Sequence, residues 1–140
     1  MKKFIYISIV MAVLLFTLFE WLRHPLPVTK GTHTISGLLK QVDIYTDKYG
    51  VPHIFADNEQ DLFFAAGYIA ARDRLFQLSL VSLAVRGGLS SVLGPGYLEK
   101  DIYFRTWKIL ETAIKLVENM DARNKIIFED FCKGINFRID

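Results

Sequence analysis

The sequence predicts a mostly helical α+β chain that carries one β-hairpin behind an N-terminal membrane segment. Three observations lead to this prediction. Residues 4–19 form an uncharged, strongly apolar run, residues 42–56 alternate like paired strands around a turn, and apolar side chains recur at helical spacing beyond them. With 140 residues, of which 51% are hydrophobic, the chain holds one domain at most and is too apolar to be a disordered tail.

Charge and cysteine content narrow the class of protein further. The chain has 17 basic and 15 acidic side chains and a formal net charge of +2. So small a surplus builds no long-range field, which excludes a polybasic nucleic-acid binder. The single cysteine, Cys132, forms no internal disulfide and builds no multi-thiolate metal site by itself, so we expect it to be a small side chain of the core.

The N-terminal apolar run has the features of a membrane helix. Lys2 and Lys3 precede the run, and Glu20 ends it. At a rise of ~1.5 Å per residue the run spans ~24 Å, which is shorter than the ~30 Å hydrocarbon core of a bilayer. This length therefore suits the apolar part of a signal peptide as well as a short anchor.

The residues at the end of the run favour an anchor over a cleaved signal. Leu18 and Phe19 are bulky, and bulky side chains fit the pocket of a signal peptidase poorly. We expect an uncleaved signal-anchor over residues 1–22, in contact with the membrane through residues 4–22. The flanking lysines then remain cytoplasmic, and the body is exported to the periplasmic or extracellular side.

A connector and a β-hairpin are predicted next. Pro25 and Pro27 interrupt helix formation, which makes residues 23–41 a stiff connector. Residues 42–47 then alternate as a strand, Gly50 supplies the left-handed position of the turn, and residues 51–56 return. Because an isolated hairpin is marginal in water, it must join a larger sheet or lie against a helix.

A long helix is predicted after the hairpin. Asn58 can cap it, with Asp61 at the third helical position, and Gly87 and Gly88 stop it after about Arg86. The first half of this helix has almost no polar face. A helix that is apolar on all sides must be surrounded, which indicates that the chain is a piece of something larger.

Further helices fill the rest of the chain. A short helical piece at residues 89–93 and a turn at residues 94–96 precede a predicted helix over residues 98–119. Asp121 can cap a last helix toward Phe137, which Gly134 is expected to interrupt. The helix over residues 98–119 has a predicted inward stripe formed by Leu98, Ile102, Thr106, Ile109, Ala113 and Val117.

A polar cluster interrupts the apolar part of the long helix. It consists of Arg72, Asp73, Arg74 and Gln77. The arginines can bind the carboxylate of a substrate, or the cluster can be a structural ion-pair network that ties the helix to the rest of the body. We favour the structural interpretation, because apolar residues flank the cluster on both sides and buried charges need partners.

Several blocks of sequence carry a family resemblance. Gly-Val-Pro-His-Ile at residues 50–54 precedes Asp-Arg-Leu-x-Gln at residues 73–77, and the similarity continues through Arg-Gly-Gly-Leu at residues 86–89 and Gly-Ile-Asn at residues 134–136. With these blocks the chain resembles the start of the penicillin acylase family of N-terminal-nucleophile hydrolases. The resemblance covers roughly residues 25–136. Ser91 stands where the family often carries a glutamate.

The resemblance implies an αββα hydrolase made as an exported precursor, a zymogen that cuts itself into α and β subunits. Residues 42–140 correspond to the N-terminal part of the α subunit, an incomplete domain. The first β residue, usually serine, attacks the amide with its own α-amino group as base. The implied partners of this chain are the remainder of the α subunit and the β subunit. The complete enzyme is expected to bind calcium, whereas we assign no cofactor or metal site to this chain.

No catalytic residue is assigned within the chain. Thr32 follows a glycine but lies in the connector, and Ser79 and Ser82 lie in the long helix with no evident base. The three histidines, His24, His33 and His53, are not spaced like a metal motif.

Two functions of different classes remain open. The first is the N-terminal segment of an amidohydrolase that acts on the C–N bond of linear amides, such as the side chain of a beta-lactam in antibiotic metabolism or an acyl-homoserine lactone, and that is inactive without its β subunit. The alternative is a membrane-anchored, non-catalytic helical interaction module or the product of a decayed gene. The apolar helix favours the first, because a solitary module should not expose such a surface.

Overall fold

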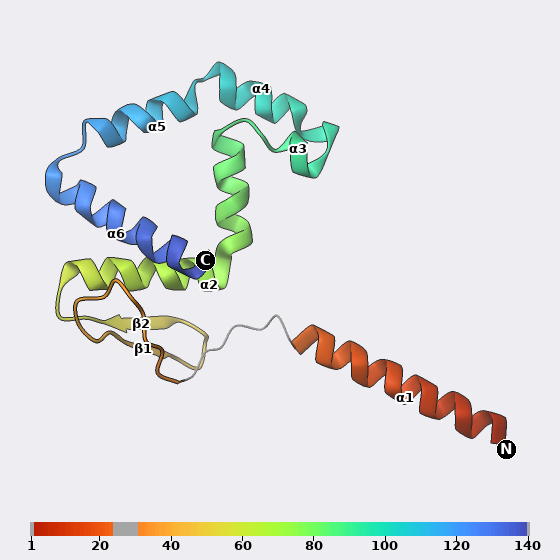
Figure 1. Ribbon diagram of the computed structural model, residues 1–140. Coiled ribbons are helices and arrows are strands. Elements are labelled where there is room, and N and C mark those ends of the chain that lie inside the picture. Colours follow the sequence, from red (N-terminus) through yellow and green to blue (C-terminus); the bar gives the residue numbers. More distant parts are fainter. Residues whose placement is uncertain (1, 24–30, 140) are drawn as a thin grey trace. The chain divides into compact units, whose positions relative to one another are not determined.

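The computed structural model describes residues 2–23 and 31–139 (Figure 1). It divides into two compact units, Met1–Thr34 and Ile35–Asp140. The first unit contains the helix α1 (Lys2–Arg23), and the second contains a two-stranded sheet and the other helices. Part of the predicted connector, residues 24–30 with Pro25, Pro27 and His24, lies outside the described residues.

The helix α1 matches the predicted apolar segment. The segment Lys3–Leu22 has a mean hydropathy of 2.2, and none of its residues is buried. By length and composition this helix is long and apolar enough to cross a membrane. The helix is longer than the uncharged run, since 22 residues at ~1.5 Å span ~33 Å. An apolar N-terminal helix of this kind is a candidate signal sequence or membrane anchor.

The predicted hairpin is present and lies against a helix. β1 (Asp43–Thr46) pairs antiparallel with β2 (Pro52–Phe55), with Ile44 opposite Ile54. These two isoleucines are half-buried, and β2 packs against the long helix α2. At the turn, Gly50 adopts a φ of +83°, in the left-handed region expected for it.

The side chain of Asp47 organises the hairpin turn. Its Oδ1 accepts the backbone N–H groups of Tyr49 at 2.8 Å and Val51 at 2.9 Å. Asp47 Oδ2 lies 3.4 Å from His53 Nε2 on the facing strand. Side-chain contacts of Asp47 therefore stabilise the turn, in addition to the few backbone hydrogen bonds between the two short strands.

The long helix α2 (Glu59–Val85) begins and ends as predicted but is not continuous. Asn58 Oδ1 accepts the N–H of Asp61 at 2.8 Å, and Arg86 is the C-terminal cap. Inside the helix, Arg74 leaves the helical region with φ −137° and ψ 22°, which produces the bend visible in Figure 1. The prediction of one unbroken helix was therefore wrong. The bend lies within the polar cluster, at the end of the apolar half of α2.

A second helix, α6 (Ala122–Ile139), packs against the first half of α2 and forms the core with it. Asp121 caps α6 as predicted, since its Oδ1 accepts the N–H of Asn124 at 3.0 Å. Gly134 does not interrupt the helix, contrary to the prediction. It is buried where α6 crosses α2 beside Gly67, so its missing side chain serves close packing. In the described part of the chain, the buried apolar residues are Phe64, Ala65, Ile69, Ala71 and Leu89.

The predicted helix over residues 98–119 is two helices. After α3 (Ser90–Leu93) and the 3₁₀ turn η1 (Pro95–Tyr97), α4 (Leu98–Thr106) ends and α5 (Ile109–Glu118) begins across Trp107 and Lys108. Lys108 adopts a left-handed conformation with φ +51°, which turns the chain. The predicted inward stripe is also wrong for most of its members, because Leu98, Ile102, Thr106 and Val117 are exposed and only Ile109 and Ala113 are partly buried.

Candidate functional site

The polar cluster lies at the bend of α2. Arg72 Nε and Nη2 donate to the two carboxylate oxygens of Asp73 at 2.7 and 3.0 Å. The side chain of Arg72 is only 9% exposed, whereas that of Asp73 is 32% exposed. Hydrogen bonding to Asp73 raises the pKa of the Arg72 guanidinium, although burial opposes this. The Asp73 carboxylate thus neutralises the nearly buried guanidinium of Arg72.

The other two residues of the cluster form a separate pair. Arg74 Nη1 donates to Gln77 Oε1 at 3.3 Å, and both side chains are exposed. The structure therefore divides the four predicted residues into two pairs, each formed within α2. Among the described residues, no hydrogen bond links these pairs to another element. A role for the cluster in tying α2 to other parts of a larger body remains a prediction.

Replacing Asp73 tests the structural interpretation of the cluster. Asp73→Asn removes the charge that compensates Arg72, and we expect the free energy of unfolding to fall by about 2 kcal/mol. Arg74→Gln removes only an exposed contact and should change it by less than about 0.5 kcal/mol. Chemical denaturation of both variants measures the difference. Equal stability of Asp73→Asn and the parent chain would contradict a structural role.

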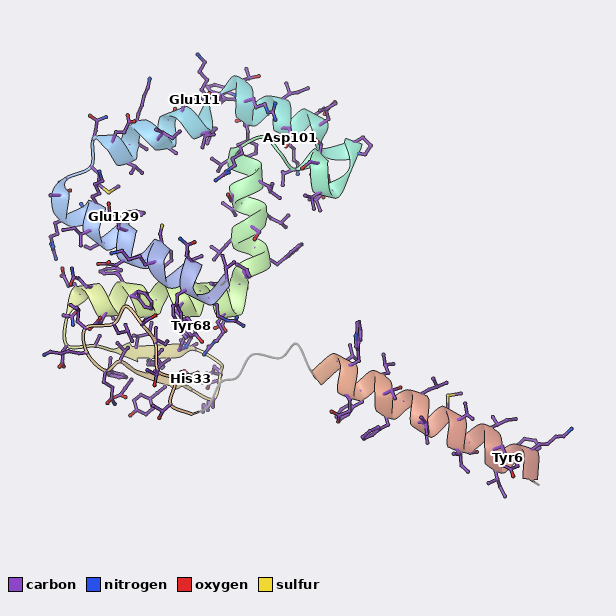
Figure 2. All side chains as sticks on the ribbon, in the orientation of Figure 1. Tyr6, His33, Tyr68, Asp101, Glu111 and Glu129 are labelled. Atoms are coloured by element: carbon purple, nitrogen blue, oxygen red, sulfur yellow. The ribbon has the colours of Figure 1, made fainter. Side chains whose placement is uncertain are left out.

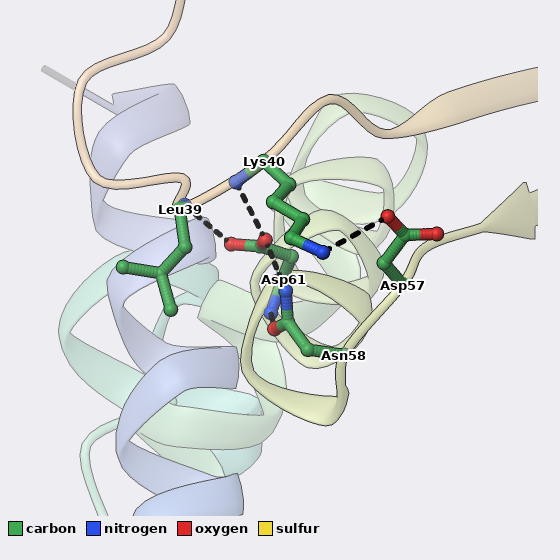
Figure 3. Close-up of polar contacts among 5 residues, drawn as sticks. All are labelled: Leu39, Lys40, Asp57, Asn58 and Asp61. Atoms are coloured by element: carbon green, nitrogen blue, oxygen red, sulfur yellow. Dashed lines mark hydrogen bonds and ion pairs between the residues drawn. The ribbon is translucent and has the colours of Figure 1, made fainter.

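A second site, which sequence reasoning missed, is a carboxylate that clamps the chain before the hairpin (Figure 3). Asp61 is buried, and its Oδ1 and Oδ2 accept the N–H groups of Leu39 at 2.8 Å and Lys40 at 2.9 Å. Asn58 Nδ2 also donates to Oδ2, at 2.6 Å. Asp61 thereby fixes residues 39–40 to the start of α2. Its position in the first turn predicted only an interaction with the helix dipole.

Asp101 on α4 repeats the same arrangement. It is buried, and its oxygens accept the N–H groups of Leu89 and Ser90, both at 2.8 Å. Figure 2 labels Asp101 beside the segment that contains α3. Arg105 Nε donates to the carbonyl of Gly87 at 3.0 Å. Together these contacts fix the segment between α2 and α3 to α4.

A third buried carboxylate, Asp130 on α6, is satisfied on one side only. Its Oδ1 accepts from Lys133 Nζ at 2.6 Å, and this contact raises the pKa of Lys133. Asp130 Oδ2 is enclosed and has no hydrogen-bond partner among the described residues. A buried carboxylate with one unpaired oxygen opposes rather than supports folding.

The clamping carboxylates make stability depend on pH. Burial raises the pKa of Asp61, but hydrogen bonds from Leu39, Asn58 and Lys40 outweigh this effect and hold the pKa below its ordinary value. The pKa of Asp101 is lowered in the same way, against burial, by Ser90 and Leu89.

We expect this pH dependence to appear only in acid. A carboxyl whose pKa is lower in the folded state contributes stability that is complete above its unfolded pKa of about 3.9 and is lost as pH falls through the folded value. The melting temperature should therefore be nearly constant down to about pH 4 and should fall below it. Thermal melts between about pH 2.5 and 7 measure this, and a constant melting temperature down to the lowest pH would exclude the clamps as stabilising groups.

The outer face of the hairpin forms a shallow open cavity of about 460 Å³. It is lined by Asp43, Tyr45, His53 and Phe55. Tyr45 and Phe55 meet edge to face with ring centroids 5.8 Å apart. His53 is partly engaged by Asp47 across the turn. This wide aromatic surface lacks a nucleophile and a converging set of donors.

The other candidate nucleophiles are not assembled into a catalytic arrangement. Thr32, Ser79 and Ser82 are exposed. Cys132 is exposed as well, so its expected place in the core was wrong; the residues of α6 that lie against α2 include Phe131, Gly134 and Ile135 instead. No group of three metal-ligating side chains occurs in residues 2–23 and 31–139.

The chain is similar in sequence to known proteins of one family. Residues 41–140 match the family described as penicillin amidase. The acyl-homoserine lactone acylase QuiP of Pseudomonas aeruginosa is 36% identical over 79% of this chain and 13% of its own length. The penicillin acylase 2 proenzyme of a Pseudomonas species is 32% identical over 84% of this chain and 15% of its own length.

A solved structure supports the same assignment. The thermostable penicillin G acylase from Alcaligenes faecalis superposes with a TM-score of 0.61 and 31% identity, over 71% of this chain and 53% of the solved chain. The present chain spans only about a seventh of the length of the two curated relatives, QuiP and the penicillin acylase 2 proenzyme. The family match covers the part of the chain that contains the hairpin, α2 and α6.

Proposed function

The chain belongs to the penicillin amidase family, and from this premise we propose that it forms the N-terminal segment of an amidohydrolase that cleaves the C–N bond of linear amides. The match of residues 41–140 to the family carries this proposal, because it covers the whole body after the connector. Two relatives are named as acylases of different substrates, a penicillin and an acyl-homoserine lactone. The side chain of a beta-lactam and an acyl-homoserine lactone are therefore the two substrate classes to be tested.

In this proposal the chain contributes scaffold rather than chemistry. The complete enzyme is a precursor of the αββα hydrolase type, which matures into α and β subunits, and residues 42–140 open its α subunit. The nucleophile and the groups that stabilise the oxyanion belong to the β subunit. The part that this chain plays is to present a hairpin and two crossed helices, fixed by the carboxylate clamps of Asp61 and Asp101. Calcium, if bound, is held by residues outside this chain.

The proposal predicts no amide hydrolysis by the chain alone. Thr32 is exposed in the connector, whereas a nucleophile needs a general base held within hydrogen-bond distance of it. Purified chain should release no product above buffer from chromogenic phenylacetyl or fatty-acyl amides. Co-expression with the polypeptide that the gene encodes after Asp140 should produce turnover. Turnover by the chain alone would contradict the proposal that the catalytic groups lie in the β subunit. The absence of a downstream reading frame with a Gly followed by Ser, Thr or Cys would contradict the proposed amidohydrolase function.

We also propose that α1 holds the protein in a membrane with the body on the periplasmic or extracellular side. The support is the length and hydropathy of Lys3–Leu22 and the two lysines, Lys2 and Lys3, at its N-terminal end. Alkaline carbonate should leave the protein in the membrane fraction, and protease added from outside should remove the body from intact spheroplasts. A mature N-terminus near His24 would show instead that α1 is a cleaved signal.

A further inference from the structure

The helix α5 has two sharply separated faces. At 100° per residue its polar side chains, which include Glu111 and Lys115, fall within one arc, and its apolar side chains fall within the other. Figure 2 labels Glu111 on this helix. We call the apolar arc the α5 face; it consists of Ile109, Leu110, Ala113, Ile114, Leu116 and Val117.

The α5 face is largely uncovered. Leu110 is 37% exposed, Val117 45% and Ile114 48%. Trp107, at the bend before α5, is 64% exposed as well. Contiguous apolar surface of this kind is rare on a complete soluble body and marks a contact with another surface.

The helix α5 also lacks the support that a short helix needs. It has 10 residues, and isolated helices below ~12–15 residues are marginal in water. Within the described part of the chain, α4 is the element on which α5 chiefly packs. The left-handed conformation of its N-cap residue, Lys108, adds conformational cost at the N-terminal end. Burial of the α5 face must therefore supply stability from outside this body.

The charge of this region argues against a nucleic acid or an anionic lipid as the covering partner. Residues 98–118 contain four basic side chains (Lys100, Arg105, Lys108, Lys115) and four acidic ones (Glu99, Asp101, Glu111, Glu118). A balanced set builds no attractive field for a polyanion. An apolar protein surface fits better, because burial of the α5 face is then the main driving force.

The lengths of the relatives indicate which protein surface that is. This chain spans 13% to 15% of the curated relatives that it matches, so most of each relative is further polypeptide. We propose that the α5 face is the surface on which the later polypeptide of the same precursor docks, and that α5 becomes a stable helix only when that polypeptide covers it. This proposal rests on the proposed function, since it requires the remainder of the amidohydrolase.

Two double variants of the full chain test the proposal. Leu110→Gln with Ile114→Gln places two glutamines on the α5 face, whereas Glu111→Gln with Lys115→Gln places two glutamines at the same spacing on the polar arc. Both pairs leave the net charge of the chain unchanged. Each variant is co-expressed with the polypeptide encoded after Asp140, and the amount that co-purifies is measured. We expect at least a tenfold loss for the apolar pair and less than a twofold change for the polar pair.

Hydrogen exchange separates docking from simple misfolding. In the chain alone, amides of α5 should exchange at least tenfold faster than those of α2 and α6, and both double variants should keep the α2 and α6 protection. Adding the downstream polypeptide should protect α5 in the parent chain and in the polar pair only.

The outcomes distinguish this proposal from the proposed function. Equal co-purification of both double variants overturns the α5 docking surface, and hydrolysis by those complexes would leave the amidohydrolase intact. Selective loss in the apolar pair supports the docking surface even where the parent complex hydrolyses no amide. Protection of α5 in the chain alone, with sedimentation as a dimer, assigns the face to a second copy and overturns the proposal.

Discussion

Gly134→Ala is expected to break the contact between α2 and α6 and to lower the free energy of unfolding of the body by about 3 kcal/mol. A Cβ at position 134 would overlap the carbonyl group of Phe64 and would lie 2.8 Å from the backbone nitrogen of Tyr68. These atoms belong to the helix backbone, so no side chain can rotate away to make room. The two helices must move apart, and the buried contacts of Phe64 are then lost.

A matched glycine provides the control for this experiment. Gly96 lies in the 3₁₀ turn, and a Cβ there meets no atom within 4 Å. Gly96→Ala should therefore leave the unfolding midpoint in denaturant nearly unchanged, whereas Gly67→Ala should behave like Gly134→Ala because it meets the backbone of Phe131. If Gly134→Ala unfolds at the same denaturant concentration as Gly96→Ala, the close crossing of α2 and α6 is wrong.

The second large effect is expected at the clamp before the hairpin. Asp61→Asn replaces one accepting oxygen by an amide that faces a backbone donor, so an N–H of Leu39 or Lys40 loses its partner in a buried place. We expect the free energy of unfolding to fall by about 3 kcal/mol, since hydrogen bonds to a charged group are lost and a buried donor remains unpaired. Denaturant unfolding measures the loss.

A neighbouring carboxylate distinguishes the clamp from a general effect of charge. Asp57 has a side chain that is 70% exposed and a single contact of 3.3 Å with Lys40 Nζ. Asp57→Asn removes the same charge and should change stability by less than about 0.5 kcal/mol. Hydrogen exchange of the Leu39 and Lys40 amides should accelerate only in Asp61→Asn. Unchanged exchange at these two amides would contradict the clamp, even if global stability fell.

Local features of the chain were predictable because their causes lie within a few residues. Asn58 and Asp121 cap helices through contacts with backbone groups three positions away. Gly50 supplies a left-handed residue to a turn that closes between adjacent strands. The apolar run before Glu20 needs only its own composition to form α1. The polar cluster was recognised in the same way, since charges stand out in an apolar helix.

The errors lie where one segment decides the conformation of another. The bend at Arg74 and the break at Lys108 interrupt stretches whose apolar spacing continues through them, so periodicity alone predicted unbroken helices. Gly134 was expected to interrupt its helix, because a glycine in isolation lowers helix propensity. Its burial against Phe64 gives it the opposite role.

By itself, the sequence determined the apolar N-terminal helix, the hairpin with its turn, the caps of α2 and α6 and the resemblance to the penicillin acylases. The tertiary structure alone decided that Asp61 clamps amides 21 and 22 residues before it, that Asp101 fixes the segment of Leu89 and Ser90, and that two glycines let α2 and α6 cross. The physical reason is the separation along the chain over which each kind of interaction acts. Propensities, caps and turns act between neighbours along the chain, whereas buried hydrogen bonds and close packing depend on which distant groups meet in space.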